Sequence, residues 1–518
     1  MGKLKEIVEQ IGVEPTFRSI GGCEIKIPSP YCLVIFGAYG DLARKKLVPS
    51  LYRLHKGKLL PEKFFILGAG RKEMNNGQFI ELMRGAVKSE LPEDFDDSSW
   101  LEFGTKLYYL SFDFDVPESY IKLLKEKLIP LEKKHRTREN RMFYLATPPT
   151  VFKTVIHNLG LSGFAREEKG HAHIVIEKPF GHDLDSARRL NLVLKKYFNE
   201  SQIFRIDHYI AKETVQNMLM FRFANSLFEP LWNSRYIDHV QITVSETLGV
   251  EDRASYYEEA GVIKDMFQSH IFQLLAMTAM EPPVAFEADR VRDEKIKVLY
   301  SIRPFPLDSL NEYIVIGQYG KGKINGNQVV GYREEPKVAT KSTTPTFAAM
   351  KIFVDNWRWH GVPFYLRSGK RLSSRRTSIS IHFKPVPYMM FSQFMEGAIE
   401  PNVLVFKIQP EEGISLTFQT KKPGSVVCLN GAAMDFSYQK GVFFDAYEWV
   451  LLDCMLGDEI LFWKEEGVEQ SWALLTPVIE RLEATTEVEK FPNYEAGSAG
   501  PEEAALLIEK DGRSWRPL

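Results

Sequence analysis

The feature that most constrains this chain is an alternation of apolar and amphipathic segments between Tyr31 and about Phe204. The apolar segments have the character of strands, and they are YCLVIFGAYG, KFFILGAGR, RMFYLATPP and HIVIEKPFG. Amphipathic helical stretches follow them, including one that ends near Gly57. Near-continuous apolar strands separated by helices predict a parallel sheet covered on both sides. We expect a doubly wound, Rossmann-type domain over residues 28–205, after an N-terminal extension of residues 1–27.

The pattern changes after about Ile206. Helical periodicity covers roughly Ala211 to Asn225 and Ala260 to Met280. Alternating segments then appear as HVQITVSETLGV, SISIHFKPV, NVLVFKIQP and ISLTFQTK, and helical patterns return from DAYEWVLLDCML onward. The chain has 518 residues, whereas single hydrophobic cores stop growing at roughly 250–300 residues. We therefore expect a second, larger α+β domain over residues 206–518, with helices and a mostly antiparallel sheet.

Charge and cysteine usage narrow the class of protein. Lys and Arg total 66 against 68 acidic residues, so the formal net charge is -2. This balance carries no global pattern for binding nucleic acid or an anionic membrane. The four cysteines form no CxxC motif, and they are Cys23, Cys32, Cys428 and Cys454. We expect these thiols to be free and mostly buried. The N-terminus has the pattern of a short amphipathic helix and not of a signal peptide, and no apolar stretch has the length of a membrane span. Together these features predict a cytoplasmic protein.

A glycine-containing turn follows the first predicted strand. Its residues are Gly37, Ala38, Tyr39, Gly40, Asp41, Leu42 and Ala43, which give the spacing GxxGxxA. Glycine permits a tight turn and a close approach of the backbone to a pyrophosphate, and the small last residue lets helix and strand pack closely. Free N–H groups at the helix start would then bind phosphate. The alternative is a plain strand-to-helix turn that uses glycine for its geometry alone.

The second predicted strand ends at Gly70-Arg71-Lys72. NAD-specific sites usually place an acid near this point to hold the ribose 2′-hydroxyl, whereas arginine suits a 2′-phosphate. A guanidinium group binds phosphate oxygens as a planar, two-pronged donor. Arg71 therefore favours NADP, while Glu73 lies close by and keeps NAD open. The alternative for Arg71 is a solvated cation in a loop.

Lys178 comes directly after the strand-like segment HIVI, within EKPFG. The end of a parallel strand is where ligands bind in open α/β sheets, which makes this lysine a candidate ligand group. The bond between Lys178 and Pro179 is a candidate for the cis form. The alternative is an ordinary turn at the end of a strand, with an exposed lysine.

The segment RIDHYIAK, residues 205–212, is dense in polar groups. If a helix starts near Tyr209, then His208 and Lys212 share one face, and two such donors suit a phosphate. The alternative is a solvated helix start that Asp207 caps.

Two further segments carry candidate residues. Asp265 and His270 lie in an otherwise apolar helical stretch, where a core histidine held by a carbonyl is the simpler explanation. Lys370 adds a cation in the turn after the strand-like GVPFYL.

The chain resembles the glucose-6-phosphate dehydrogenase family from about Cys32 to Pro501. The resemblance is carried by FGAYGDLARKK, IEKPFG, RIDHYIAKETVQN, FRFANSLFEPLWN, GVIKDMFQSH, GVPFYLRSGK and DAYEWVLLD. It implies that His270 is the catalytic base and that Asp207 orients it. It implies a substrate site of Lys178, His208, Tyr209, Lys212, Glu246, Asp265, Lys370, Arg375 and Gln409, with His208, Tyr209 and Lys212 near the phosphate. It implies a coenzyme site of Gly37, Ala38, Tyr39, Gly40, Asp41, Leu42, Arg71 and Lys178.

The resemblance also implies a reaction. D-glucose 6-phosphate is oxidised at C1 to 6-phospho-D-glucono-1,5-lactone, with hydride transfer to NADP, as the first step of the oxidative pentose phosphate pathway. The alternatives are a related hexose-6-phosphate dehydrogenase that uses NAD or both coenzymes, and a catalytically silent sensor of NADP or sugar phosphate. We expect no metal in the reaction, because the sequence contains no cluster with ligand spacing.

The family resemblance further implies a homodimer or homotetramer. A second, structural NADP site is one interpretation of the polar residues Lys407, Lys421, Lys422 and Asp435, and solvated strand ends are the other. Three residues depart from the family pattern: Tyr39 replaces a Ser or Thr, Ala211 replaces a glycine, and Phe152 replaces a tyrosine of some members. We expect these changes to affect coenzyme binding more than the chemistry.

Overall fold

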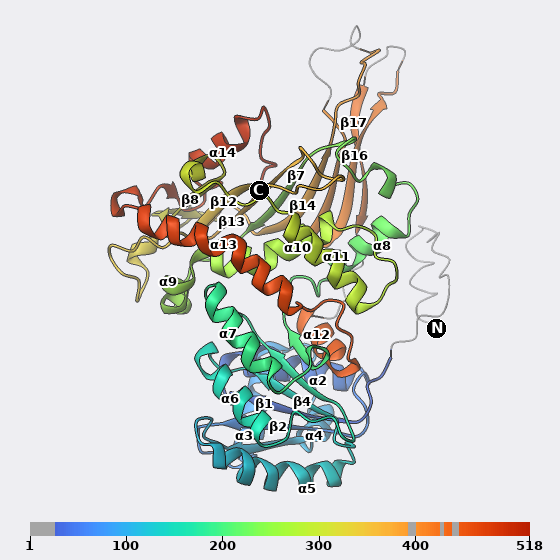
Figure 1. Ribbon diagram of the computed structural model, residues 1–518, viewed down its shortest axis with the longest axis vertical. Coiled ribbons are helices and arrows are strands. Elements are labelled where there is room, and N and C mark those ends of the chain that lie inside the picture. The colour runs from blue at the N-terminus through green and yellow to red at the C-terminus, as the bar shows by residue number, and fades with distance from the viewer. Residues whose placement is uncertain (1–25, 392–399, 425–428, 438–444) are drawn as a thin grey trace.

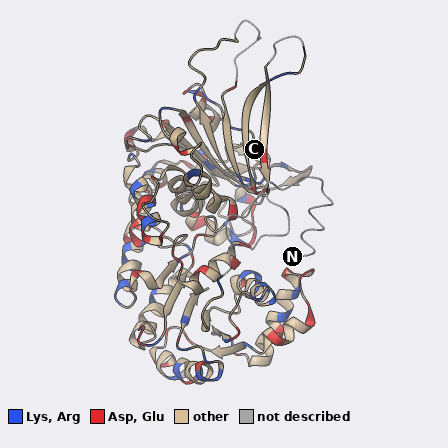
Figure 2. Cartoon of the chain, turned by 90° about the vertical axis from the view of Figure 1, so that its right-hand side faces the viewer, with Lys and Arg blue, Asp and Glu red and all other residues tan. Residues whose placement is uncertain are grey.

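The computed structural model describes residues 26–391, 400–424, 429–437 and 445–518. The helix expected at the N-terminus lies outside the described residues, as do Cys23 and Cys428. The described chain forms two large sheets, one in each half of an elongated molecule, with helices around and between them (Figure 1). Charged side chains of both signs are interspersed over both halves, as the small net charge leads one to expect (Figure 2).

Six parallel strands form the first sheet, in the order β3-β2-β1-β4-β5-β6. They are β1 (Tyr31–Phe36), β2 (Phe64–Gly70), β3 (Leu107–Ser111), β4 (Arg141–Leu145), β5 (Ala172–Ile176) and β6 (Ile203–Arg205). β1 and β2 are buried along their whole length, which explains their unbroken apolar sequences. This strand order is that of the doubly wound dinucleotide-binding fold and confirms the first part of the predicted fold class.

Helices connect these strands and cover the sheet (Figure 1). They are the π-helical η1 (Ala43–Leu47) and η2 (Ser119–Leu124), α2 (Val48–Lys56), α3 (Asn76–Glu90), α4 (Asp97–Gly104), α5 (Lys125–His135), α6 (Pro149–Leu161), α7 (Leu184–Lys195) and the short 3₁₀ turn η3 (Glu200–Gln202). The first predicted helix is η1 continued by α2, and it ends at Gly57 as expected. Asn75, Asp96 and Asp183 cap the starts of α3, α4 and α7 by accepting a backbone N–H.

The second sheet has eight strands in the order β17-β16-β15-β14-β7-β13-β12-β8. They are β7 (Ile237–Ser245), β8 (Ile314–Gly317), β12 (Phe347–Phe353), β13 (Pro363–Gly369), β14 (Arg376–Phe383), β15 (Val403–Gln409), β16 (Gly413–Lys421) and β17 (Leu429–Ser437). Only β7 and β13 pair in parallel among these described strands, so the expected mostly antiparallel sheet is confirmed. Two small pairs lie outside it: β9 (Tyr319–Gly320) with β18 (Tyr494–Glu495), and β10 (Gly322–Ile324) with β11 (Asn327–Val329).

The second part of the chain also contains helices (Figure 1). They are α8 (Glu213–Phe223), α9 (Ala254–Val262), the π-helical η6 (Ile263–Ile271), α10 (Phe272–Ala279), α11 (Ala288–Ser301), α12 (Ala446–Leu456), α13 (Glu465–Thr485) and α14 (Glu502–Glu509), with short 3₁₀ turns η4 (Glu229–Leu231), η5 (Glu251–Arg253), η7 (Leu307–Glu312), η8 (Tyr332–Glu334) and η10 (Val488–Lys490). The helical stretch expected near 260–280 is present but changes direction at Gly261, whose φ is +58°.

The helix considered near Tyr209 begins later than that prediction required. Residues 208–212 form turns, and α8 starts at Glu213, with Lys212 as its N-cap residue. The cause is local, because Asp207 Oδ1 accepts the N–H of Tyr209 at 3.0 Å and holds a turn in place of a helix. His208 and Lys212 therefore do not share a helical face, and Asp207 does not cap α8.

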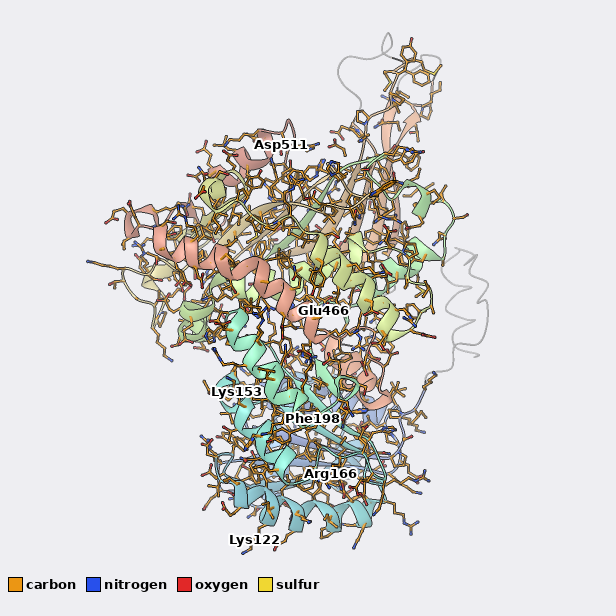
Figure 3. The ribbon with its side chains drawn as sticks, viewed as in Figure 1. Lys122, Lys153, Arg166, Phe198, Glu466 and Asp511 are labelled. Atoms are coloured by element: carbon orange, nitrogen blue, oxygen red, sulfur yellow. The ribbon has the colours of Figure 1, made fainter. Side chains whose placement is uncertain are left out.

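The C-terminal part of the chain returns to the first sheet. α12 packs against α2, and α13 packs against α7. The indole N–H of Trp472 donates to the carbonyl of Phe180 at 2.9 Å. Glu466, at the start of α13, lies at the level where the two halves meet (Figure 3). The two halves therefore share an interface made by segments far apart in the sequence, and the division at 205/206 stays a prediction.

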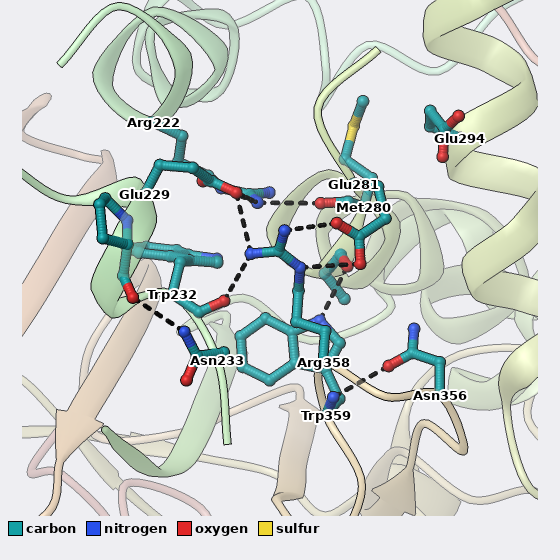
Figure 4. A network of polar contacts seen from close by, with 12 residues as sticks. Arg222, Glu229, Trp232, Asn233, Met280, Glu281, Glu294, Asn356, Arg358 and Trp359 are labelled. Atoms are coloured by element: carbon teal, nitrogen blue, oxygen red, sulfur yellow. Dashed lines mark hydrogen bonds and ion pairs between the residues drawn. The ribbon is translucent and has the colours of Figure 1, made fainter. Parts of the chain in front are cut away.

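A buried arginine braces the helices of the second half. Arg222 is fully buried, and its guanidinium donates to the carbonyls of Thr278 at 3.0 Å and Met280 at 2.9 Å. Glu229 pairs with Arg222 at 3.2 Å and with Arg358 at 2.8 Å (Figure 4). This network ties α8 to the end of α10.

None of the described helices combines the length and the apolar character needed to cross a bilayer.

Candidate active site

Three candidate residues meet because of where their elements end. Lys178 follows β5, and Asp207 follows the neighbouring strand β6, so both side chains lie at the same edge of the parallel sheet. η6 carries His270 to this edge from the second half of the molecule. The bond between Lys178 and Pro179 is cis.

The imidazole of His270 is held from both sides. Its Nδ1 lies 2.6 Å from Oδ1 of Asp207, and its Nε2 lies 2.6 Å from Nζ of Lys178. An ammonium group can only donate, so Nε2 accepts from Lys178 and Nδ1–H donates to Asp207. This is the neutral tautomer in which Nε2 carries the lone pair. His270 is therefore arranged as a proton acceptor that a carboxylate holds in place, and the structure brings together the two residues that the resemblance paired.

Burial and charge act together on this cluster. Burial lowers the pKa of His270, and the attraction of Asp207 opposes that effect only in part. Burial alone would raise the pKa of Asp207, but the imidazole of His270 outweighs it, and the pKa of that carboxyl is well below its ordinary value. The cluster therefore pairs an ionised carboxylate with a neutral imidazole near neutral pH.

Asp265 joins the cluster through Lys178. The ammonium of Lys178 donates to the backbone carbonyl of Asp265 at 2.6 Å and to its Oδ1 at 3.3 Å. The hydroxyl of Tyr256 also donates to this oxygen, at 3.3 Å. Burial would raise the pKa of Asp265, but Lys178 and then Lys370 lower it below its ordinary value. Lys178 is thus shared between an acid and the proton-accepting nitrogen of His270.

A cleft with about 1340 Å³ of empty space adjoins the cluster. Its lining includes six of the predicted substrate residues, namely His208, Tyr209, Lys212, Glu246, Arg375 and Gln409. The ring of Tyr209 stacks on His270 with 4.2 Å between centroids, and the ring of His208 meets it edge-on at 4.7 Å. His270 itself is buried, and its ring contacts these two residues, which line the cleft. The rings of His208 and Tyr209 thus lie between the proton acceptor and the cleft.

Cations and acids lie together around Lys212 in the cleft. Lys212 donates to the side-chain carbonyl of Gln409 at 2.9 Å, and burial lowers the pKa of this lysine. Arg375 and Lys46 line the same space, although Glu412 and Asp445 do so as well. Sequence reasoning did not single out the other lining residues, although most of them lie in segments that it quoted; they are Lys46, Glu213, Thr247, Leu248, Glu412, Asp445, Ala446 and Tyr447. Lys46, Lys212 and Arg375 are the cations of this cleft that could bind an anionic group.

Lys370 lies deeper than the other predicted substrate residues. It is buried, and its ammonium forms an ion pair with Oε2 of Glu246. The same ammonium lies over the ring of Tyr257, 5.1 Å from its centroid. Lys370 therefore fixes the carboxylate of Glu246, which lines the cleft.

The glycine-containing turn lies at the same edge of the first sheet. Gly37 has φ +84°, and a Cβ at this position would come within 2.6 Å of the carbonyl oxygen of Ala146. Gly40 closes the turn, since its N–H donates to the carbonyl of Gly37 at 2.9 Å. Only glycine meets both demands at Gly37, so the turn is built for a close backbone approach. A pyrophosphate at the start of the following helix fits this turn.

Tyr39 and Arg71 lie side by side beyond that turn. The ring of Tyr39 covers Gly70, where an added Cβ would meet it at 2.6 Å. The guanidinium of Arg71 is half exposed and pairs with Asp115 at 2.5 Å and Asp113 at 3.7 Å. No sequence pattern pointed to these two acids, because they follow β3, a short strand that the apolar pattern does not mark. Arg71 is thus available at the surface but already has acidic partners.

Lys295 on α11 is a further neighbour that sequence reasoning missed. It is buried, and its ammonium lacks a hydrogen-bond partner among the described residues. Burial, followed by repulsion from Arg292, lowers the pKa of Lys295 to about 7, while the charge of Asp207 opposes this. In a helix of ordinary amphipathic pattern, a lysine gives no signal that it will be buried.

Two of the polar residues considered for a second NADP site pair with each other. Lys407 on β15 pairs with Asp435 on β17 at 3.0 Å, and both side chains are exposed.

Comparison with known proteins decides the family. The model described as "Glucose-6-phosphate dehydrogenase, NAD binding domain" matches residues 34–217, and the model of the C-terminal domain of the same enzyme matches residues 219–516. The chain belongs to the glucose-6-phosphate dehydrogenase family. This membership makes it an oxidoreductase that uses a nicotinamide cofactor.

Individual members of the glucose-6-phosphate dehydrogenase family match along almost the whole chain. The glucose-6-phosphate 1-dehydrogenase of Chlamydia pneumoniae is 46% identical over 511 residues, which cover 97% of this chain and 99% of that protein. The enzyme of Bacillus subtilis (strain 168) is 43% identical over 486 residues and covers 93% of this chain and 97% of its own.

Solved structures of this dehydrogenase family share the fold. A glucose-6-phosphate dehydrogenase in complex with its substrate glucose 6-phosphate superposes with a TM-score of 0.86 at 34% identity. The match covers 96% of this chain and 100% of that one. The glucose-6-phosphate 1-dehydrogenase of Mycobacterium avium superposes with a TM-score of 0.80 at 33% identity, covering 95% of this chain and 99% of that one. Both parts of the predicted fold class are therefore present.

Proposed function

We propose that this protein oxidises D-glucose 6-phosphate at C1 to 6-phospho-D-glucono-1,5-lactone, with hydride transfer to NADP. The observation that carries the proposal is the neutral imidazole of His270, which is held between Asp207 and Lys178 near a cleft that Lys212 and Arg375 line. Membership of the dehydrogenase family supports the same reaction.

His270 is the base in this proposal. Its Nε2 takes the proton of the C1 hydroxyl, and Asp207 stabilises the imidazolium that forms. Lys178 occupies Nε2 before substrate arrives, so the sugar must displace its ammonium. The displaced ammonium then remains near the reacting oxygen, where it can donate a hydrogen bond. A proton acceptor buried in this way keeps its lone pair near neutral pH.

The cleft holds the sugar at its two ends. Lys212, His208 and Tyr209 bind the phosphate, and Arg375 and Gln409 of the same cleft support them. Glu246, Asp265 and Lys370 bind the ring hydroxyls, because the two carboxylates accept hydrogen bonds and the ammonium donates them. A doubly charged phosphate gains charge-assisted hydrogen bonds from Lys212 and Arg375.

The coenzyme lies along the carboxyl edge of the first sheet. The turn from Gly37 to Leu42 holds the pyrophosphate, Arg71 holds the 2′-phosphate, and Lys178 lies where the nicotinamide meets the sugar. A nicotinamide ring bound there would supply the hydride acceptor. The exposed pair of Arg71 with Asp115 is weak, so a phosphate can replace Asp115. That same pair favours a second candidate, dual use of NADP and NAD, since it places an acid beside the arginine that would hold the 2′-phosphate.

An absorbance assay at the NADPH band tests the function. Purified protein is given glucose 6-phosphate with NADP and, in parallel, with NAD. We expect NADPH to form faster than NADH. Equal rates would favour dual coenzyme use. Binding of both ligands without reduction of either coenzyme would contradict the proposal and favour a silent sensor.

We also propose the setting of the enzyme. Cys32 and Cys454 are free and buried, which suits the reducing cytoplasm. The second sheet ends on β17, a mostly exposed strand with apolar side chains such as Met434, and such a face suits a homodimer or homotetramer. Size-exclusion chromatography with light scattering distinguishes these from a monomer.

A further inference from the structure

A group of ligand-forming side chains lies at the opposite end of β5 from Lys178. We call Glu167, His171 and His173 the β5 cluster. One potential metal-binding atom from each of them lies within 4.8 Å of the others. Figure 3 labels Arg166, which precedes this cluster, in the half of the molecule that holds the first sheet. The cluster is separate from the substrate cleft, because none of its residues lines that cleft.

His173 is prepared for metal binding by its second ring nitrogen. Nδ1 lies 2.7 Å from the backbone carbonyl of Cys454. A carbonyl can only accept, so Nδ1 carries the proton and Nε2 carries the lone pair. Metal-binding histidines typically have this arrangement, in which a carbonyl or carboxylate fixes the tautomer and the ring orientation.

The backbone brings the other two side chains to His173. Residues two apart on an extended segment point to the same side, so His171 lies next to His173, with 5.7 Å between ring centroids. Nδ1 of His171 is 3.8 Å from Oε1 of Glu167. This oxygen also accepts the N–H of Ala172 at 2.9 Å, which holds the carboxylate at the start of the strand. Two imidazoles and a carboxylate therefore converge.

We propose that the β5 cluster binds a Zn²⁺ ion. Two histidines and one carboxylate are a known ligand set for zinc, with water in the fourth tetrahedral position. Bonds of about 2.0–2.1 Å bring such ligand atoms roughly 3.3 Å apart, so a rotation of the exposed His171 closes the site. Imidazole nitrogens disfavour Mg²⁺ and Ca²⁺, which prefer oxygen ligands. The sequence had led us to expect no metal, because no cluster with ligand spacing was recognised in it.

The surroundings leave space for the ion and its water. The cluster borders a cavity with about 1410 Å³ of empty space that also contacts Arg141, Glu459 and Lys26. Arg141 is already paired with Glu132 at 2.7 Å, so its charge is largely neutralised. The net field at the cluster therefore does not exclude a divalent cation.

The ion would join two distant parts of the chain. His173 belongs to β5, and the carbonyl that orients it belongs to α12, whose first turn lines the substrate cleft with Ala446 and Tyr447. Metal binding at His173 therefore stabilises the contact between β5 and α12. The expected effect is on the folded state, because the cluster and the cleft lie at opposite ends of these elements.

Calorimetric titration of the chelator-treated protein with ZnCl₂ tests this proposal. The expected result is saturable binding of one Zn²⁺ per chain and a rise in the unfolding temperature with Zn²⁺. His171→Gln should weaken this binding by at least about 10-fold and remove the rise. His360→Gln is the matched control, because His360 is also exposed and also lies near a carboxylate, with Asp355 at 3.9 Å, but outside the cluster. It should bind as the wild type does.

Two results would overturn the proposal. One is the lack of saturable Zn²⁺ binding by the wild-type chain. The other is binding that His171→Gln leaves unchanged, which would assign the ion to other histidines such as His208 and His270. Because His171 is exposed, its replacement should leave the unfolding temperature without Zn²⁺ at the wild-type value, and this comparison separates lost binding from lost folding.

Discussion

The catalytic cluster and the coenzyme edge of the first sheet each contain a short polar contact to a carboxylate, and the two contacts lie at different depths. Asp207 and His270 are buried and lie 2.6 Å apart, whereas Arg71 and Asp115 are half exposed or more and lie 2.5 Å apart. Water screens the second pair and leaves the first almost unscreened. Distance alone therefore does not rank these contacts. The buried pair should control the chemistry, and the exposed pair should only adjust the choice of coenzyme.

The most severe loss of activity is expected from His270→Gln. Glutamine keeps a polar side chain of similar reach but cannot accept the proton from the C1 hydroxyl. Loss of a general base typically costs about 10²–10⁴-fold in rate, so kcat should fall by that factor. Sugar-phosphate binding, measured by calorimetry, should stay close to wild type. A fall of less than about 10-fold, below the usual range for a general base, would contradict the role of His270.

The same contrast between a buried and an exposed side chain applies to the stability effects of two arginines, Arg222 and Arg71. Replacing the buried Arg222 by Met leaves the carbonyls of Thr278 and Met280 without their donor, and it should lower the free energy of unfolding by about 3–5 kcal/mol. Replacing the half-exposed Arg71 by Met should cost less than about 1 kcal/mol. Denaturant unfolding of both variants checks this. Equal losses would show that depth does not separate the two arginines.

Lys212 is intermediate, because it is partly buried and lines the open cleft. Lys212→Met removes a charge-assisted hydrogen bond to the sugar phosphate, which is worth about 1.5–3 kcal/mol. KM for glucose 6-phosphate should rise by roughly 10- to 100-fold, with kcat changed much less. Lys46→Met, at the rim of the same cleft, is the control and should have a smaller effect. A fall in kcat with unchanged KM would place Lys212 in the chemistry instead.

The mildest change is expected at the exposed pair. Arg71→Ala should lower kcat/KM for NADP by up to about 10-fold, since an exposed charge contributes little, and should leave NAD almost unchanged. Asp115→Asn should act in the opposite direction by freeing Arg71 for the 2′-phosphate. Steady-state rates with both coenzymes measure this. Equal losses with NADP and NAD in Arg71→Ala would remove Arg71 from coenzyme recognition.

The sequence predicted most of the fold because its long strands are apolar or alternate clearly. β3 and β6 were not singled out, because LYYLS carries little contrast and IFR is only a three-residue strand. The return of α12 and α13 to the first sheet could not be predicted, since helical periodicity indicates a buried face but not its partner.

The candidate site was predicted through its residues more than through its geometry. Lys178 was placed by the rule that ligands gather at the carboxyl ends of parallel strands, and Asp207 follows the same rule in the structure. The turn after Asp207 was misjudged as the start of a helix, because a side-chain acceptor that competes with helix formation is not visible in a periodic pattern. Asp115 and Lys295 were missed because only tertiary packing brings them near Arg71 and Asp207.

The role of His270 as the proton acceptor is tested by the pH dependence of kcat/KM. Burial lowers the pKa of His270, so the neutral base persists as pH falls through about 6.5, the ordinary pKa of histidine, and activity should decline only at lower pH. His270→Gln should lose this acidic limb and show a low, flat rate over the same range. An acidic limb that persists unchanged in His270→Gln would mean that another group accepts the proton, and His270 would then lose its role as the base.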